Sequence, residues 1–164
     1  MQYKQMGRTG LKVSAVSIGT MFFGTQVNEA EAIKILDTAF DKGVNLFDTA
    51  DAYAGGKSEE IVGKAIQNKR QSVVLATKIG HKQGPGPNDS GLSREHIIRG
   101  VEVSLKRLGT DYIDIYYAHT PDYSTPTEET LRAFDQLVQQ GKVRYVACSN
   151  IRAWQLTKSL WVSD

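Results

Sequence analysis

A single alternation runs through the whole chain: short β-rich runs take turns with stretches that have the apolar spacing of amphipathic helices. The β-rich runs are residues 13–18, 44–47, 72–77, 113–117 and 143–147. The stretch after the first run places Ile33, Leu36 and Phe40 at helical intervals, and a fifth helix is predicted from about Arg152. Strand and helix in regular alternation predict a parallel sheet covered by helices on its faces.

Local signals mark the ends of these helices. The run from Asn28 to Glu31 resembles a capping box, and Ser58 and Ser93 are predicted to cap the next two helices. The Thr125-Pro126-Thr127-Glu128 segment predicts a cap followed by a proline at the first helical position. Glycines are expected at the helix ends, at positions 43, 109 and 141.

Two architectures fit the alternation. Five strand–helix units would complete a doubly wound sheet, and they would also form part of an eight-stranded barrel of about 250 residues. The chain has 164 residues, so length slightly favours the doubly wound sheet. The alternation by itself does not distinguish the doubly wound sheet from the barrel.

Composition excludes several partners. The net charge of +2 is too small to indicate a nucleic-acid partner, and no apolar run reaches the roughly 18 residues of a membrane span. One cysteine, Cys148, excludes an internal disulfide, and residues 1–5 lack the apolar run of a signal peptide. We therefore expect a cytoplasmic protein without nucleic-acid or membrane partners.

Polar side chains follow the predicted strands at regular intervals. Asp48, Lys78, His119 and Asn150 stand at four consecutive strand ends, and Tyr53 follows Asp48 by five residues. Because the carboxyl ends of parallel strands share one rim of the sheet, these groups are expected to converge there. A carboxylate, an amine, a phenol and an imidazole together suit acid–base chemistry at an oxygen atom.

Each of these residues alone has an ordinary structural interpretation. Asp48 could cap a strand end, Tyr53 could pack on a helix, and Asn150 could cap the last helix. Other residues are predicted to be structural only. They comprise a loop histidine, a helix-surface histidine, two tryptophans on a buried helix face and a small buried thiol: His81, His96, Trp154, Trp161 and Cys148.

The joint pattern resembles the aldo-keto reductase family. The resemblance lies in Gly43-Val44-Asn45-Leu46-Phe47-Asp48-Thr49-Ala50-Asp51-Ala52-Tyr53 and continues in residues 56–59, 76–78, 114–122, 141–144 and 149–150. It implies a (βα)8 TIM barrel of which about five βα units are present. Residues 1–164 are then expected to form one incomplete barrel domain, a fragment whose open strand edges favour self-association.

The resemblance also implies a reaction, the NADPH-dependent reduction of an aldehyde or ketone, a small-molecule carbonyl substrate. Tyr53 would be the general acid, Lys78 would favour the phenolate form, and Asp48 would hold Lys78 charged. His119 would bind the substrate oxygen. Ser149 and Asn150 would bind the nicotinamide carboxamide, and Gly19 and Thr20 would line the cofactor through their backbone.

Three points stay open. The residue after Thr20 is Met21, and Thr120 follows His119, where many relatives carry aromatic residues, so the substrate class is undecided. The segments that grip the cofactor phosphates in this family would lie beyond residue 164, so the isolated fragment is expected to be inactive. A regulatory subunit resembling the potassium-channel β-subunits is the alternative, because those proteins share the barrel. A doubly wound nucleotide-binding domain is disfavoured, because no G-x-G-x-x-G or Walker-type loop is present.

Overall fold

The computed structural model describes residues 1–163. Five parallel strands pair in the order β3-β4-β5-β6-β7, which is also their order in the chain. Their bounds are β3 Ser17–Gly19, β4 Leu46–Asp48, β5 Val74–Ile79, β6 Ile113–Ala118 and β7 Val143–Cys148. A doubly wound sheet reverses its strand order at a switch point, whereas this order never reverses. The chain therefore forms part of a (βα)8 barrel.

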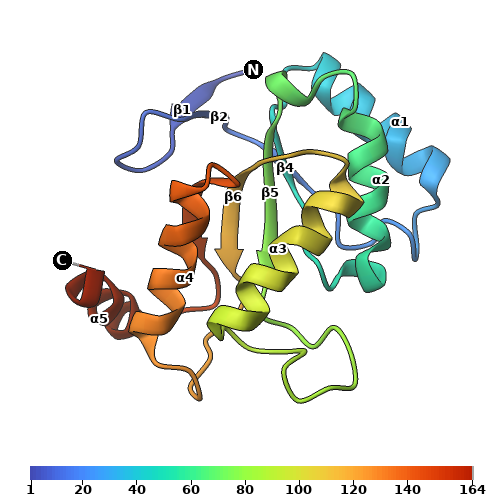
Figure 1. The fold of residues 1–164 in the computed structure, drawn as a ribbon. Helices are drawn as coiled ribbons and strands as arrows, with labels where there is room; N and C mark the ends of the chain where they lie inside the picture. Colours follow the sequence, from blue (N-terminus) through green and yellow to red (C-terminus); the bar gives the residue numbers. More distant parts are fainter. Residues whose placement is uncertain (164) are drawn as a thin grey trace.

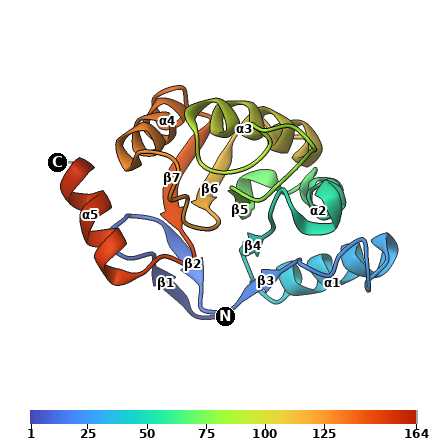
Figure 2. The ribbon, with the colours of Figure 1, turned by 90° about the horizontal axis from the view of Figure 1, so that it is seen from below.

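One helix follows each strand and lies outside it. These helices are α1 Glu29–Asp41, α2 Lys57–Ile66, α3 Arg94–Leu108, α4 Thr127–Gln139 and α5 Ala153–Ser163, with short 3₁₀ turns η1 Tyr53–Gly56 and η2 Arg70–Ser72. Figure 2 shows the strands along an arc, with the helices on its outer side. In Figure 1 the strand arrows point toward the loops that carry the polar residues.

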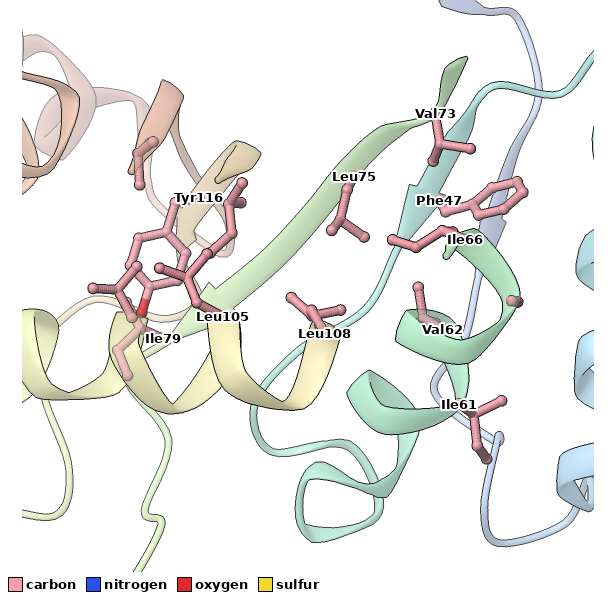
Figure 3. Packing of buried hydrophobic residues seen from close by; sticks show 14 of the residues in the cluster. Phe47, Ile61, Val62, Ile66, Val73, Leu75, Ile79, Leu105, Leu108 and Tyr116 are labelled. Carbon is pink, nitrogen blue, oxygen red and sulfur yellow. The ribbon is translucent and has the colours of Figure 1, made fainter. Parts of the chain in front are cut away.

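The main core lies between the strands and the helices. Phe47, Leu75 and Ile79 from the strands meet Ile66 and Leu108 from α2 and α3, and all five are essentially inaccessible to water (Figure 3). These residues occupy the outward positions of their strands and the apolar stripes predicted for the helices. Burial of this shared apolar surface is what fixes the helical layer on the sheet.

The predicted strand 13–18 is wrong, because it is two elements. Residues Lys12–Ser14 form β2, which pairs antiparallel with β1 Tyr3–Gln5, and only Ser17–Gly19 enters the parallel sheet as β3. The Ser14 hydroxyl donates to the Val16 carbonyl at 2.6 Å, and the Ser14 amide donates to Asn45 Oδ1 at 2.7 Å. These bonds turn the chain between the two strands.

The β1–β2 hairpin lies at the end of the sheet where the strands begin (Figure 1). Its connecting loop and second strand bring Met6, Leu11 and Val13 against a small cluster on the inner face of the strands that includes Val74 and Ile115. The hairpin therefore covers part of the barrel interior opposite the polar rim.

Two of the predicted helix caps are present. The Asn28 side chain accepts from the Glu31 backbone amide at 3.0 Å, so the predicted cap is confirmed, but the Glu31 carboxylate accepts from the Asn28 side chain at 2.9 Å and not from its backbone amide as a capping box requires. Ser93 caps α3. Gly109 ends α3 in the left-handed conformation with φ +62°.

The other two predicted caps are wrong. Ser58 lies inside α2, whose cap is Gly56, and its hydroxyl turns instead to the carbonyl of Thr20 at 2.9 Å. Pro126 is itself the cap of α4 rather than its first helical residue, and the Thr125 hydroxyl donates to Asp122 at 2.7 Å. The Ser58 hydroxyl is thus engaged by a distant segment, and the Thr125 hydroxyl by a carboxylate in its own loop.

Three burial predictions also fail. His96 is buried rather than on the helix surface, because the loop before α3 folds over it and its Nδ1 pairs with the Gly91 carbonyl at 2.9 Å. Trp154 and Trp161 are 59% and 80% exposed. Within residues 1–163, α5 packs mainly on α4 and has no buried residue, so both indoles face outward.

Neither a membrane span nor a metal cluster is found in the described part of the chain. No helix within residues 1–163 is both long enough and apolar enough to cross a bilayer. The same residues contain no group of three or more histidine, cysteine or acidic side chains arranged to hold a metal ion.

Candidate active site

Lys78 is the centre of the polar rim. It is the last residue but one of the buried strand β5, and only 6% of it is exposed. Its ammonium pairs with the Asp48 carboxylate, donates to the Thr49 carbonyl at 2.7 Å and lies 3.4 Å from the Tyr53 hydroxyl. A buried charge is tolerated only when it is paired and hydrogen-bonded, and these three oxygens meet that need.

Strand register brings Asp48 to Lys78. Asp48 pairs with Ala76 in the β4–β5 ladder, and the Thr49 amide donates to the Ala76 carbonyl at 2.9 Å. Lys78 lies two residues beyond Ala76 on the same face of β5, so its side chain lies diagonally across from Asp48 on the neighbouring strand and pairs with it. Tyr53 follows in η1, where Ala54 takes a left-handed conformation with φ +51°. That conformation is unusual for a residue with a side chain, and it turns the chain sharply behind Tyr53.

His119 completes the group from the end of β6. Its amide donates to the Ile79 carbonyl at 2.8 Å, and its ring meets Tyr53 edge to face with 5.8 Å between centroids. Burial, the neighbouring His81 and the Lys78 charge together lower the pKa of His119 to about 4. The imidazole is therefore neutral at physiological pH, with one nitrogen carrying a hydrogen and the other a lone pair.

Gly19 and Thr20 lie beside Asp48 but differ in accessibility. Thr20 is fully buried, its amide donates to the Asp48 carbonyl at 3.0 Å, and its hydroxyl pairs with Ser58 at 2.8 Å. Gly19 pairs with Asp48 in the β3–β4 ladder and is exposed, with no heavy atom within 4 Å of the position a Cβ would take. Thr20 therefore helps to hold Asp48 in place, and Gly19 leaves open space beside Asp48.

Ser149 and Asn150 stand at the end of β7, next to His119. The Ser149 amide donates to the Ala118 carbonyl at 2.9 Å. Asn150 does not cap α5. Its side-chain Nδ2 donates to the His119 carbonyl at 2.8 Å and to the Ser149 hydroxyl at 3.1 Å. Its backbone has φ +57°. Asparagine tolerates this left-handed conformation better than most residues. The structure thus brings all the predicted site residues to one rim.

Sequence reasoning missed a buried polar cluster directly behind this rim. Glu59 in α2 is fully buried, accepts from Thr77 at 2.7 Å and from Arg107 at 3.2 Å. Asp51 is only 3% exposed, and neither of its carboxylate oxygens has a hydrogen-bond partner among the described residues. Burial and the nearby Glu59 raise the pKa of Asp51 to about 7.

A signal for part of this cluster was present in the sequence. Glu59 lies three and seven residues before Val62 and Ile66, so it falls on the apolar stripe of α2. A charged residue on such a stripe must find a partner in the core. Arg107, forty-eight residues later, supplies that partner, and no spacing rule connects the two.

The chain belongs to the aldo/keto reductase family, whose family model matches residues 15–162. It is 48% identical over its whole length to a protein of Arabidopsis thaliana named a probable voltage-gated potassium channel subunit beta, of which it covers 51%. It is 44% identical to the uncharacterized oxidoreductase YrpG of Bacillus subtilis, with 97% of the chain and 52% of that protein covered.

A solved structure extends the comparison to three dimensions. The holo form of aldo-keto reductase AKR11C1 from Bacillus halodurans superposes with a TM-score of 0.90 at 39% identity, over 98% of this chain and 54% of that one. The chain therefore spans about half the length of the relatives it matches. Family and barrel fold are both established by these similarities.

Proposed function

We propose that the protein reduces an aldehyde or ketone to an alcohol with NADPH. The observation that carries the proposal is the ammonium of Lys78, held between the carboxylate of Asp48 and the hydroxyl of Tyr53. Carbonyl reduction requires a proton at the oxygen while the carbon accepts a hydride. A tyrosine beside a permanently placed cation is suited to release that proton.

Each side chain then has one task. Tyr53 gives its hydroxyl proton to the carbonyl oxygen, and Lys78 stabilises the phenolate that remains. Asp48 holds the ammonium charged and in place through their ion pair. His119, neutral at physiological pH, donates a hydrogen bond to the same carbonyl oxygen and orients it toward Tyr53.

The rim offers a partial fit for the cofactor. The Ser149 hydroxyl and the unused Oδ1 of the Asn150 amide are complementary to a carboxamide, and exposed Gly19 leaves open space beside Asp48. These residues would hold the nicotinamide end of NADPH, which supplies the hydride when bound. The solved structure of AKR11C1 is a holo form, which supports a cofactor in this family.

The test uses a completed barrel. We define this as residues 1–164 joined to the part of AKR11C1 that follows its matched region, because the chain alone covers 54% of that protein. We expect the completed barrel to bind NADPH, as followed by fluorescence, and to oxidise it when an aromatic aldehyde is added. A completed barrel that binds NADPH but leaves aldehydes unreduced would contradict the proposal.

A regulatory role is the second candidate, and the names of the relatives favour it. Proteins from Arabidopsis thaliana, Oryza sativa and Schizosaccharomyces pombe that are 45–48% identical in this region carry the name of potassium-channel β-subunits. We propose as the alternative that the protein binds a membrane channel from its aqueous side. Coprecipitation of a voltage-gated potassium channel with the completed barrel would support it, and binding that persists in Tyr53→Phe would separate it from catalysis.

A further inference from the structure

His81 is held directly over His119 by the shape of the loop after β5. Gly80 has φ +135°, a conformation closed to residues with side chains, and a Cβ there would lie 3.3 Å from Leu92. The Gly91 amide then donates to the Gly80 carbonyl at 2.9 Å, which ties the two ends of the loop together. The chain reverses at once, and His81 returns toward the strand ends.

The two imidazoles meet edge to face. Their centroids are 4.3 Å apart at an interplanar angle of 80°, closer than the 5.8 Å between His119 and Tyr53. His81 is exposed, whereas His119 is buried at 8% exposure. The His81 ring is thus in contact with water, and it covers the buried ring of His119.

Among residues 1–163, no free negative group stabilises a proton on His119. Around its ring lie the ammonium of Lys78 from β5, the phenol of Tyr53 from η1 and the imidazole of His81 from the loop. The nearby carboxylate of Asp48 is engaged by Lys78, and the Nδ1 atom of His119 has no hydrogen-bond partner within the described residues. The surroundings therefore disfavour the charged form.

We propose that His81 is a positioning residue that covers His119 and keeps its imidazole neutral, so that His119 stays able to donate a hydrogen bond to the substrate oxygen. Two effects act together. The His81 ring excludes water from one side of His119, and positive charge on His81 disfavours a proton on the His119 ring, because the two ring centroids are only 4.3 Å apart.

This inference rests on the proposed role of His119 at the carbonyl oxygen and adds a partner to it. Its consequence is a wider working range. A lone histidine near its ordinary pKa of about 6.5 would be half charged in mildly acidic solution, whereas the covered ring keeps one bare nitrogen and one N–H well below that pH.

The test measures the pKa of His119 directly and needs neither cofactor nor turnover. Exchange of the ring Cε1 hydrogen for deuterium, followed against pH by mass spectrometry, reports each imidazole separately. Trypsin cleaves after Lys78, Lys82, Arg94 and Arg107 among others, so His81, His96 and His119 fall on three different peptides. The completed barrel is compared with its His81→Ala variant, which removes the imidazole, and its His81→Phe variant, which keeps a ring.

In the unaltered barrel we expect the low pKa already described for His119. His81→Ala should increase the proton affinity of His119 at least about tenfold, and His81→Phe should increase it less, because the phenyl ring still excludes water. Lys82→Ala, which removes an exposed charge from the same loop, is the matched control and should leave His119 unchanged. Buried His96 reports whether each variant has kept its fold.

A His119 proton affinity that stays the same in folded His81→Ala would overturn the inference, as would an equal rise in Lys82→Ala. Neither result depends on reductase activity. If the completed barrel proved inactive while His119 responded as expected, the proposed function would fail and the coupling of the two imidazoles would stand. If the barrel were active and His119 did not respond, only the inference would fall.

Discussion

Arg107 lies between two acidic residues and neutralises only one of them. Its Nη1 atom is 3.2 Å from the Glu59 carboxylate but reaches Asp51 only at the backbone carbonyl, at 3.4 Å. Glu59 therefore has a partner from α3, while the Asp51 carboxyl is buried near that negative charge and has no hydrogen-bond partner within residues 1–163. Two predictions concern this helix interface.

Asp51→Asn should stabilise the protein at alkaline pH. The folded-state pKa of Asp51 is raised from 3.8 to about 7, so between these values the folded protein binds more protons than the unfolded chain. Stability from this group is therefore lost as pH rises from about 4 through 7. The amide cannot ionise, so we expect a gain of roughly 1–3 kcal/mol at pH 8 and little gain near pH 4.

Urea unfolding of the completed barrel at the two pH values measures this difference. Asp111→Asn removes an exposed carboxylate instead and should change neither curve. An Asp51→Asn variant that is less stable at the alkaline pH would show that the carboxylate is ionised and satisfied by water.

Gly63→Ala should destabilise the protein although alanine favours helices. A Cβ at Gly63 in α2 would lie 2.6 Å from the carbonyl oxygen of Leu108, which is backbone and cannot rotate away. Overpacking of this kind costs about 1–3 kcal/mol, against a propensity gain of about 1 kcal/mol. Gly10→Ala, with no heavy atom near its Cβ position, is the control and should be close to neutral. A raised melting temperature for Gly63→Ala would mean that α2 and α3 can move apart freely.

Tyr53→Phe should abolish carbonyl reduction by the completed barrel and largely spare NADPH binding. The change removes the proposed proton donor and keeps the ring that contacts His119. Loss of general acid catalysis costs about 10²–10⁴-fold in rate. Tyr3→Phe, whose hydroxyl donates to the Gly43 carbonyl far from the rim, serves as the matched variant. Unchanged turnover in Tyr53→Phe would assign the proton to another group.

The 164-residue chain by itself should bind NADPH weakly and show negligible turnover. Within residues 1–163, β3 and β7 pair on one side only, and α5 presents Trp154, Leu160 and Trp161 to solvent. Unpaired strand edges and exposed apolar patches favour association, so we expect oligomers at micromolar concentration. Light scattering with NADPH titration tests this, and a monomer with micromolar affinity and clear turnover would refute it.

The sequence predicted the rim well, because strand ends in a parallel sheet coincide. Asp48 and Lys78 are thirty residues apart, yet one register places their side chains in contact. The break between β2 and β3 escaped prediction because it depends on Asn45, thirty-one residues beyond Ser14. The contact of His81 with His119 depends on the conformation of Gly80, which no periodicity encodes.

The partners of buried charged residues also could not be predicted from the sequence. The stripe of α2 predicts that Glu59 faces the core, but the choice of Arg107 as its partner is a property of the packed helices. Trp154 and Trp161 show the opposite error, since apolar spacing indicates an apolar face without stating that a partner covers it.

The N-terminal hairpin has a consequence for the order in which the barrel assembles. Its strands precede the parallel strands in the sequence, yet Met6, Leu11 and Val13 pack in one cluster with Val74, Ile115 and Tyr145, which follow much later. The hairpin is therefore made before the parallel strands against which it packs. Contacts of such long sequence separation form slowly, so the docking of the hairpin on the inner face of the strands is expected to be a late step of folding.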